Sequence, residues 1–181
     1  DGYYGDELEY LKNSVRQSNE YSKTIADAFD SGRNMASYPE TNLATQLKNT
    51  ARLISGGLST KIYVVSLGGF DTHANQTNGP DTLTGEHADL MLTLGDAIAA
   101  FQNDLKALGV EQRVMGMTFS EFGRRIKANN SFGTDHGTAA PVFVFGSCAK
   151  GGIVGENPNI TDNVTDDEGV AMQYDFRSVY A

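Results

Sequence analysis

Two short apolar runs, one on each side of a long amphipathic segment, set the strongest limit on how this chain can fold. Residues 61–67 (Lys-Ile-Tyr-Val-Val-Ser-Leu) are β-branched and aromatic, as in a strand that is buried on both faces. Residues 85–108 carry an apolar stripe at helical spacing and end before Gly109, and residues 112–119 predict a second strand. Strand, helix and strand in this order predict a right-handed βαβ unit with two parallel strands.

Polar residues follow both of these predicted strands. The first strand leads into Asp71-Thr-His73, and the second leads into Ser120-Glu121. Because parallel strands end at the same edge of a sheet, we expect these side chains to gather at one edge, where open α/β sheets bind ligands. The sequence therefore predicts imidazole and carboxylate groups at the edge of the sheet where ligands bind.

A second aspartate and histidine, Asp135-His136, precede a third predicted strand over residues 140–146. Pro141 near its start is typical of an edge strand. His136 can join His73 only if this strand starts at the edge where the other two strands end. The third strand must therefore run antiparallel to the others, which an edge strand permits.

The rest of the chain predicts two further helices and a loop-rich end. Apolar residues at steps of three and four predict helices over residues 6–30 and 41–55, with Thr41 as the N-cap of the second. The composition, 39% hydrophobic and 20% charged, is typical of a globular protein. We expect a single α/β domain over residues 1–181, made of a helical part (1–57), the βαβ unit and edge strand with the candidate metal loops (58–150), and a loop-rich tail (151–181).

Charge and missing motifs exclude several classes of function. The chain has 14 Lys and Arg against 23 Asp and Glu, a formal net charge of −9, and no basic cluster. Nucleic acid is therefore a poor partner, whereas cations are good ones. No apolar stretch approaches the ~20 residues of a membrane span, so membrane insertion is not expected. A single cysteine excludes a cysteine-based zinc site, and the absence of G-x-S-x-G, Walker, G-x-G-x-x-G and H-E-x-x-H patterns disfavours the enzymes that use them.

Imidazole and carboxylate groups on separate loops form a workable shell for Zn²⁺, Mn²⁺ or Fe²⁺. The spacing alone leaves a second interpretation equally open, in which the aspartates form turns and the histidines bond to backbone carbonyls. Arg124 could hold a phosphate or sulfate group in its guanidinium fork, or it could pair with a carboxylate. For Arg125 the pairing with a carboxylate is favoured in this acidic protein.

Four motifs give the chain a resemblance to a known family: Gly68-Gly-Phe-Asp-Thr-His73, Phe119-Ser-Glu-Phe-Gly-Arg124, Gly133-Thr-Asp-His-Gly137 and Asp175-Phe-Arg-Ser-Val-Tyr180. Their order and spacing, over roughly residues 40–181, resemble the domain of unknown function 1501 family of typically exported bacterial proteins. That family is similar to the alkaline phosphatase-like superfamily of phosphatases, sulfatases and phosphoglycerate mutases. The resemblance implies a three-layer α/β fold with a mostly parallel sheet, of which this chain would be the C-terminal portion, and a periplasmic or secreted location.

In that superfamily an Asp and a His after a strand bind a first metal, and a later His completes the site. Asp71, His73 and His136 match these positions. Ser120-Glu121 stands where an Asp-His pair would bind a second metal, so only Glu121 could ligate there. The nucleophile of the superfamily comes from an N-terminal strand and helix, and no such strand is predicted before residue 61 of this sequence.

The resemblance therefore implies a metal-dependent hydrolase that acts on phosphate or sulfate esters, with a small anionic ester as substrate. Its residues would be Asp71, His73 and His136 around one ion, Asp135 as a ligand or as the support of one, Glu121 toward a second ion, and Arg124 on the anion. The expected cofactor is a divalent metal, Zn²⁺ first, with Mn²⁺, Fe²⁺ or Ca²⁺ as alternatives. The alternative function is a non-catalytic exported binding or scaffold protein on a degenerate phosphatase-like fold. If the chain is a portion of a larger domain, an exposed sheet edge should promote self-association.

Overall fold

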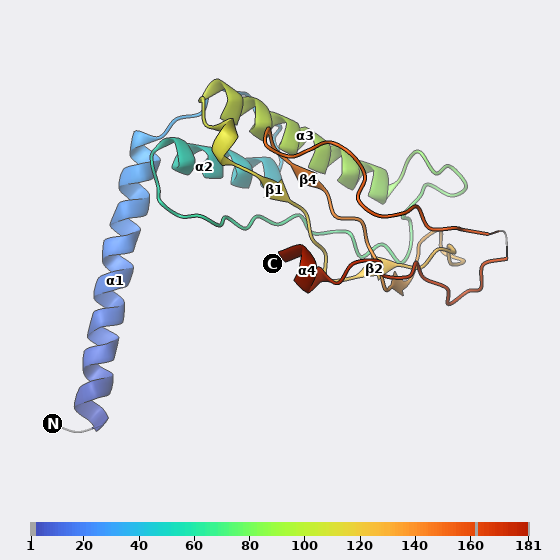
Figure 1. The fold of residues 1–181 in the computed structure, drawn as a ribbon, viewed down its shortest axis with the longest axis horizontal. Coiled ribbons are helices and arrows are strands. Elements are labelled where there is room, and N and C mark those ends of the chain that lie inside the picture. Colours follow the sequence, from blue (N-terminus) through green and yellow to red (C-terminus); the bar gives the residue numbers. More distant parts are fainter. Residues whose placement is uncertain (1–2, 162, 181) are drawn as a thin grey trace. The chain divides into compact units, whose positions relative to one another are not determined.

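The computed structural model describes residues 3–161 and 163–180 (Figure 1). Asp162 and Ala181, which belong to the predicted loop-rich tail, lie outside the described residues, as do the first two residues. The chain divides into two compact units. Unit 1 comprises Asp1–Ser66 and Asp96–Glu111, and unit 2 comprises Leu67–Gly95 and Gln112–Ala181.

All three predicted helices are present. They are α1 (Tyr3–Ser31), α2 (Asn42–Ser55) and α3 (Glu86–Ala107). α1, α2 and the C-terminal part of α3 belong to unit 1. Thr41 caps α2 as predicted, because its side-chain oxygen accepts a hydrogen bond from the backbone N–H of Ala44 at 3.2 Å. Within the described residues, no stretch of these helices has the length and hydropathy that a bilayer crossing needs.

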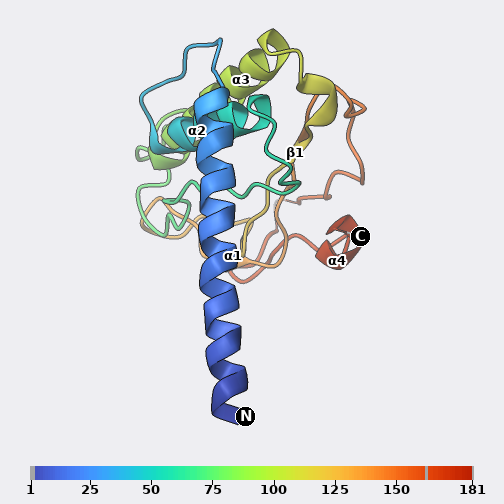
Figure 2. The same cartoon turned by 90° about the vertical axis from the view of Figure 1, so that its left-hand side faces the viewer.

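α1 meets α2 near its C-terminal end, and its N-terminal part extends away from α2 (Figure 2). Arg52 of α2 donates from Nε to the carbonyl of Phe29 at 2.7 Å, and its guanidinium lies 4.0 Å from the centre of the Phe29 ring. Leu8, Leu11 and Val15, the first half of the predicted apolar stripe, are exposed. Packing of α1 is therefore confined to its C-terminal part.

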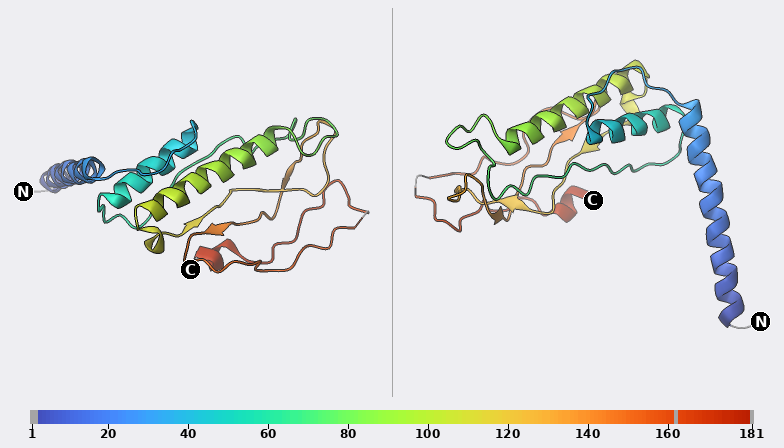
Figure 3. Two further views of the ribbon diagram at one scale, coloured as in Figure 1. Left: turned by 90° about the horizontal axis from the view of Figure 1, so that it is seen from above. Right: turned by 180° about the vertical axis from the view of Figure 1, so that it is seen from behind.

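The buried apolar side chains of the described residues all belong to unit 1. Figure 3 shows α2 beside the C-terminal part of α3, and both helices turn small and aliphatic residues inward. The spacing of three and four residues on each helix is the one that lines a single helical face. The core consists of Ala28, Leu43, Ala44, Leu47, Ala51, Ala97, Ala100, Phe101 and Leu105.

A buried aspartate ties the α1–α2 connection to α3. Asp104 is fully buried, and its carboxyl oxygens accept hydrogen bonds from Asn34 Nδ2 at 2.8 Å and from the Tyr38 hydroxyl at 2.9 Å. The backbone N–H groups of Met35 and Ala36 donate to the same carboxyl at 2.6 and 3.1 Å. Burial, and then the hydrogen bond to Asp104, raise the pKa of the Tyr38 hydroxyl. Every polar atom of this buried group is therefore matched by a partner on the connecting segment.

The strands of unit 2 are short and pair antiparallel. β1 (Gly116–Met117) pairs with β4 (Val144–Phe145), and β2 (Gly123–Arg124) pairs with β3 (His136–Gly137). A 3₁₀ turn precedes β1 at Glu111–Arg113, and a final short helix, α4, spans Phe176–Tyr180. The antiparallel orientation expected of the third strand relative to the second is confirmed, although each strand covers only part of its predicted range.

The predicted first strand does not form. Residues 61–67 are in no strand, and Ile62 and Val64 are 80% and 73% exposed. A strand requires a neighbour that accepts and donates along its backbone, and the contact found is with a side chain. Gln46 of α2 both donates to the carbonyl of Ser66 and accepts from its N–H, each at 3.0 Å. The described residues thus combine α-helices with short antiparallel strands, and they contain no parallel pair.

We expect Asp104→Ala to lower the free energy of unfolding by about 3–5 kcal/mol, because it leaves buried donors without an acceptor. Asp104→Asn should cost less, since an amide oxygen can still accept from the backbone N–H groups. Asp96→Ala, an exposed change on the same helix, is the matched control and should alter stability by less than about 0.5 kcal/mol. Urea denaturation followed by circular dichroism measures all three, and equal stabilities would contradict the anchoring role of Asp104.

Candidate metal centre

Arg124 joins the two loops that carry the predicted site. Its side chain leaves β2, and its guanidinium donates hydrogen bonds to the carbonyl of Thr134 and to the carbonyl of Phe70. A third contact, to Thr72 Oγ1, measures 3.5 Å. Because backbone carbonyls move only with their chain, these bonds hold residues 70–72 beside the segment that leads into β3.

A buried polar network reinforces this link. Gln76 Oε1 accepts hydrogen bonds from the hydroxyl of Thr72 at 3.1 Å and from that of Thr134 at 2.7 Å. The backbone N–H of Thr134 donates to the carbonyl of Thr72 at 3.3 Å. Both threonines are buried. Satisfied buried networks of this kind fix one arrangement, because breaking any bond leaves an unpaired polar group.

Two glycines let the backbones come close. A Cβ on Gly133 would overlap the backbone of His73, and a Cβ on Gly137 would overlap the backbone of Arg124. Any side chain at either position would push the loops apart. The glycines of the Gly133–Gly137 motif therefore have a direct role in forming the site.

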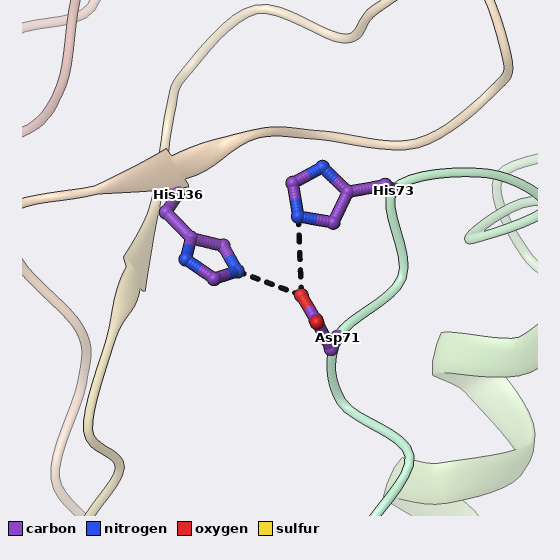
Figure 4. A group of neighbouring side chains, drawn as sticks. All are labelled: Asp71, His73 and His136. Carbon is purple, nitrogen blue, oxygen red and sulfur yellow. Dashed lines mark hydrogen bonds and ion pairs between the residues drawn. The ribbon is translucent and has the colours of Figure 1, made fainter.

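These contacts bring together Asp71, His73 and His136 (Figure 4). His136 Nε2 lies 2.7 Å from Asp71 Oδ1, and His73 Nε2 lies 3.1 Å from the same oxygen. One ligand atom from each residue falls within 4.8 Å of the others. The side chains of Asp71, His73 and His136 are 64%, 49% and 46% exposed. The three residues predicted to bind the first metal are thus neighbours, on an accessible surface.

Asp135 orients His73. Its Oδ1 lies 3.0 Å from His73 Nδ1, and Asn129 Nδ2 donates to the carbonyl of His73 at 2.8 Å. A neutral His73 that donates from Nδ1 presents the lone pair of Nε2 on the side of Asp71, as metal-binding histidines do when a carboxylate supports them. Hydrogen bonds from His73 and Asn129 lower the pKa of Asp135, and the hydrogen bond from His136 lowers the pKa of Asp71.

An aromatic ring that the sequence did not single out fixes the second histidine. Phe122 stacks on His136 with ring centres 4.1 Å apart and planes 6° from parallel. On the same ring, the guanidinium carbon of Arg124 lies 5.1 Å from the centre. Phe122 therefore restricts the plane of the His136 imidazole. The sequence signals for this residue are its place between Glu121 and Arg124 and its membership of the Phe119–Arg124 motif.

The donor set suits a transition metal. Zn²⁺ binds His nitrogen and Asp oxygen at about 2.0–2.2 Å in tetrahedral sites, which separates neighbouring ligand atoms by about 3.3 Å. The distances from Asp71 Oδ1 to the two histidines, 2.7 and 3.1 Å, need to open only slightly to admit such an ion. Three protein ligands would leave a fourth position for water or substrate. Mn²⁺ and Fe²⁺ accept similar ligands, whereas Ca²⁺ prefers oxygen throughout.

The remaining predicted residues are Glu121, Arg124 and Arg125. Glu121 is exposed and lies outside the group of Asp71 and the two histidines, so a second ion at Glu121 stays a prediction. Arg124 directs its guanidinium at backbone carbonyls, and its role on an anion also stays a prediction. The pairing of Arg125 with a carboxylate is confirmed, because its NH1 lies 2.6 Å from Asp167 Oδ1.

Comparison with known proteins identifies a family. A family described as protein of unknown function, DUF1501, matches residues 11–176. The matched range contains both loops of the candidate centre as well as Phe122 and Arg124. No curated protein and no solved structure matches the chain. The family description assigns no activity, so the function must be argued from the site.

We expect the full chain to bind one equivalent of Zn²⁺ and expect His73→Ala and His136→Ala to abolish that binding, because two protein ligands hold the ion too weakly. His87→Ala is the matched control: His87 is exposed on α3, lies outside the group, and should leave binding unchanged. Calorimetric titration and elemental analysis measure the stoichiometry. Full occupancy in His73→Ala would exclude this ligand set.

Asp135→Asn should weaken Zn²⁺ affinity by about 10- to 100-fold while the stoichiometry stays at one, since a supporting carboxylate is lost but no ligand is. Asp89→Asn, at an exposed site on α3, removes the same charge without touching a histidine and serves as control. Competition with a chelator of known affinity gives the ratio. Equal affinity in Asp135→Asn and the wild type would show that Asp135 does not support His73.

Proposed function

This chain belongs to the DUF1501 family of proteins of unknown function, and we propose that it is a metal-dependent hydrolase of phosphate or sulfate esters. The observation that carries the proposal is the cluster of Asp71, His73 and His136, whose ligand atoms lie within 4.8 Å of one another. Three ligands with a vacant fourth direction are the usual arrangement of a catalytic zinc ion. All three side chains are about half exposed, so an ester could reach an ion held there.

Each residue has a distinct part in this proposal. Asp71, His73 and His136 hold the ion, and Asp135 keeps His73 in the tautomer that ligates. A bound divalent ion polarises an ester oxygen and promotes ionisation of water. Arg124 lies 3.7 Å from Asp71 Oδ1, and its positive charge favours negative charge that develops beside the site.

An alkaline phosphatase-like fold and an exported location belong to the same proposal. The order of elements along the chain supports this proposal. The loop of Asp71 and His73 is followed by the long helix α3, the loop of Glu121, and His136 ahead of β4. The antiparallel pairing of β4 with β1 agrees with that order. A three-layer fold with a mostly parallel sheet additionally requires residues 61–67 to pair with a neighbouring strand.

A second candidate is a non-catalytic metal-dependent binding protein. The commitment of Arg124 to the carbonyls of Phe70 and Thr134 favours it, because an arginine used this way has fewer donors left for an ester. The position of Glu121 outside the metal group favours it as well, since a second ion would lack a shell among the described residues. Both candidates use the same first ion.

Hydrolysis of p-nitrophenyl phosphate and p-nitrophenyl sulfate by the full chain separates the two. We expect release of p-nitrophenol that requires added Zn²⁺ or Mn²⁺, stops with EDTA and is lost in His73→Ala, because the ion supplies the activation. His87→Ala should retain full activity. Stoichiometric metal without any metal-dependent hydrolysis would support the binding protein, and absence of metal binding would reject both candidates.

A further inference from the structure

A polar pocket lies next to the candidate metal centre. It has a volume of about 370 Å³, and its lining includes Arg125, Lys127, Asn129, Asp135 and Asp166. All of these residues belong to unit 2. Arg125 NH1 lies 3.8 Å from Asp135 Oδ2, and the other oxygen of Asp135 contacts His73. Asp135 therefore lines the pocket and also contacts a residue of the metal centre.

Two cations of the pocket are held by acidic side chains from the tail. Arg125 NH1 lies 2.6 Å from Asp167 Oδ1, and Lys127 Nζ donates to Asp166 Oδ1. The hydrogen bond from Lys127 lowers the pKa of Asp166. Asp166 thus places a carboxylate in the pocket, and Asp167 pairs with an arginine that lines it.

Contacts other than these ion pairs also hold the tail in place. The N–H of Ile126 donates to the carbonyl of Glu168 at 3.1 Å, and Arg125 and Gly169 form an isolated β-bridge. Thr138 Oγ1 donates to the carbonyl of Val170 at 3.0 Å. The aspartate side chains can consequently rotate away while the segment stays attached.

The ion pairs themselves are easily exchanged. The side chains of Asp166 and Asp167 are 84% and 87% exposed, so they keep most of their hydration. Exposed ion pairs contribute little to stability, because water and salt compete with them. A phosphate or sulfate group offers more anionic oxygens than a carboxylate and can engage the arginine fork with two of them. Asp135 opposes an anion less than its charge suggests, since His73 and Asn129 already donate to it.

We propose that Arg125 and Lys127 form a binding site for a tetrahedral oxyanion and that Asp166 and Asp167 occupy this site as intramolecular competitors. The binding site stands by itself; its use as the subsite for a charged group of the ester rests on the proposed function. The acidic pair then selects against weakly charged ligands, because only a ligand with a higher local charge displaces both carboxylates. Arg125 pairs with the mostly exposed Asp167, whereas Arg124 donates to the backbone carbonyls of Phe70 and Thr134.

The test is an NMR-detected titration of the full chain with inorganic phosphate, and separately with sulfate, at constant ionic strength and in EDTA. Wild type should bind weakly, and Asp166→Asn combined with Asp167→Asn should tighten binding about two- to tenfold, as expected when two exposed ion pairs no longer compete. Arg125→Gln combined with Lys127→Gln should abolish it. Lys127→Gln alone, at a half-exposed side chain, should weaken binding and covers the case in which the double variant misfolds.

Asp27→Asn combined with Asp30→Asn is the charge control, because it makes the same change in net charge on exposed positions of α1. An equal gain in this control would show that net charge alone sets the affinity and would overturn the proposal. Binding that survives in both cation variants would overturn it too, as would no binding in any variant. EDTA removes metal throughout, so failure of this test is distinct from failure of ester hydrolysis.

Discussion

The hydrogen bonds from Arg124 to the carbonyls of Phe70 and Thr134 are the constraint on which the candidate centre depends. The bond to Phe70 spans 54 residues of sequence, and together the two bonds join one loop that carries two of the clustered side chains to another that carries the third. The surrounding support is also polar: two buried threonines share the amide oxygen of Gln76. The buried apolar residues of the described chain lie in unit 1, so the site is positioned by hydrogen bonds and close backbone packing.

The helices could be predicted from sequence because their determinants are local. Apolar periodicity and the Thr41 cap act within one or two turns, and α2 and α3 begin and end within a few residues of their predicted bounds. Strands depend on distant partners, and here prediction was weaker. Residues 61–67 have the composition of a buried strand, yet the backbone of Ser66 bonds to the side chain of Gln46. β2 and β3 have no apolar alternation, and their pairing accompanies the contacts of Arg124.

The proximity of Asp71, His73 and His136 was predicted better than the sheet. The order of elements and an antiparallel third strand predict that Asp71, His73 and His136 meet, and that orientation is present between β1 and β4. The roles of Phe122 and Asn129 could not be read in advance, since both depend on residues brought near by folding. Of the two sequence interpretations of Arg124, the carboxylate partner is found in Asp71, whose Oδ1 lies 3.7 Å from its guanidinium, whereas its two carbonyl partners were not predicted. The physical reason is that only the folded chain shows which unpaired carbonyls need a donor.

The division between an apolar unit 1 and a hydrogen-bonded unit 2 has a thermodynamic consequence. Heat capacity of unfolding rises with the apolar area exposed and falls with the polar area. Disordering of the loops around Asp71 and His136 should therefore change heat capacity little, whereas melting of the α2 and α3 faces should change it strongly. The heat capacity change measured by calorimetry would then reflect mainly the unfolding of the helices. The cluster of Asp71, His73 and His136 could lose its order in a transition with almost no change in heat capacity.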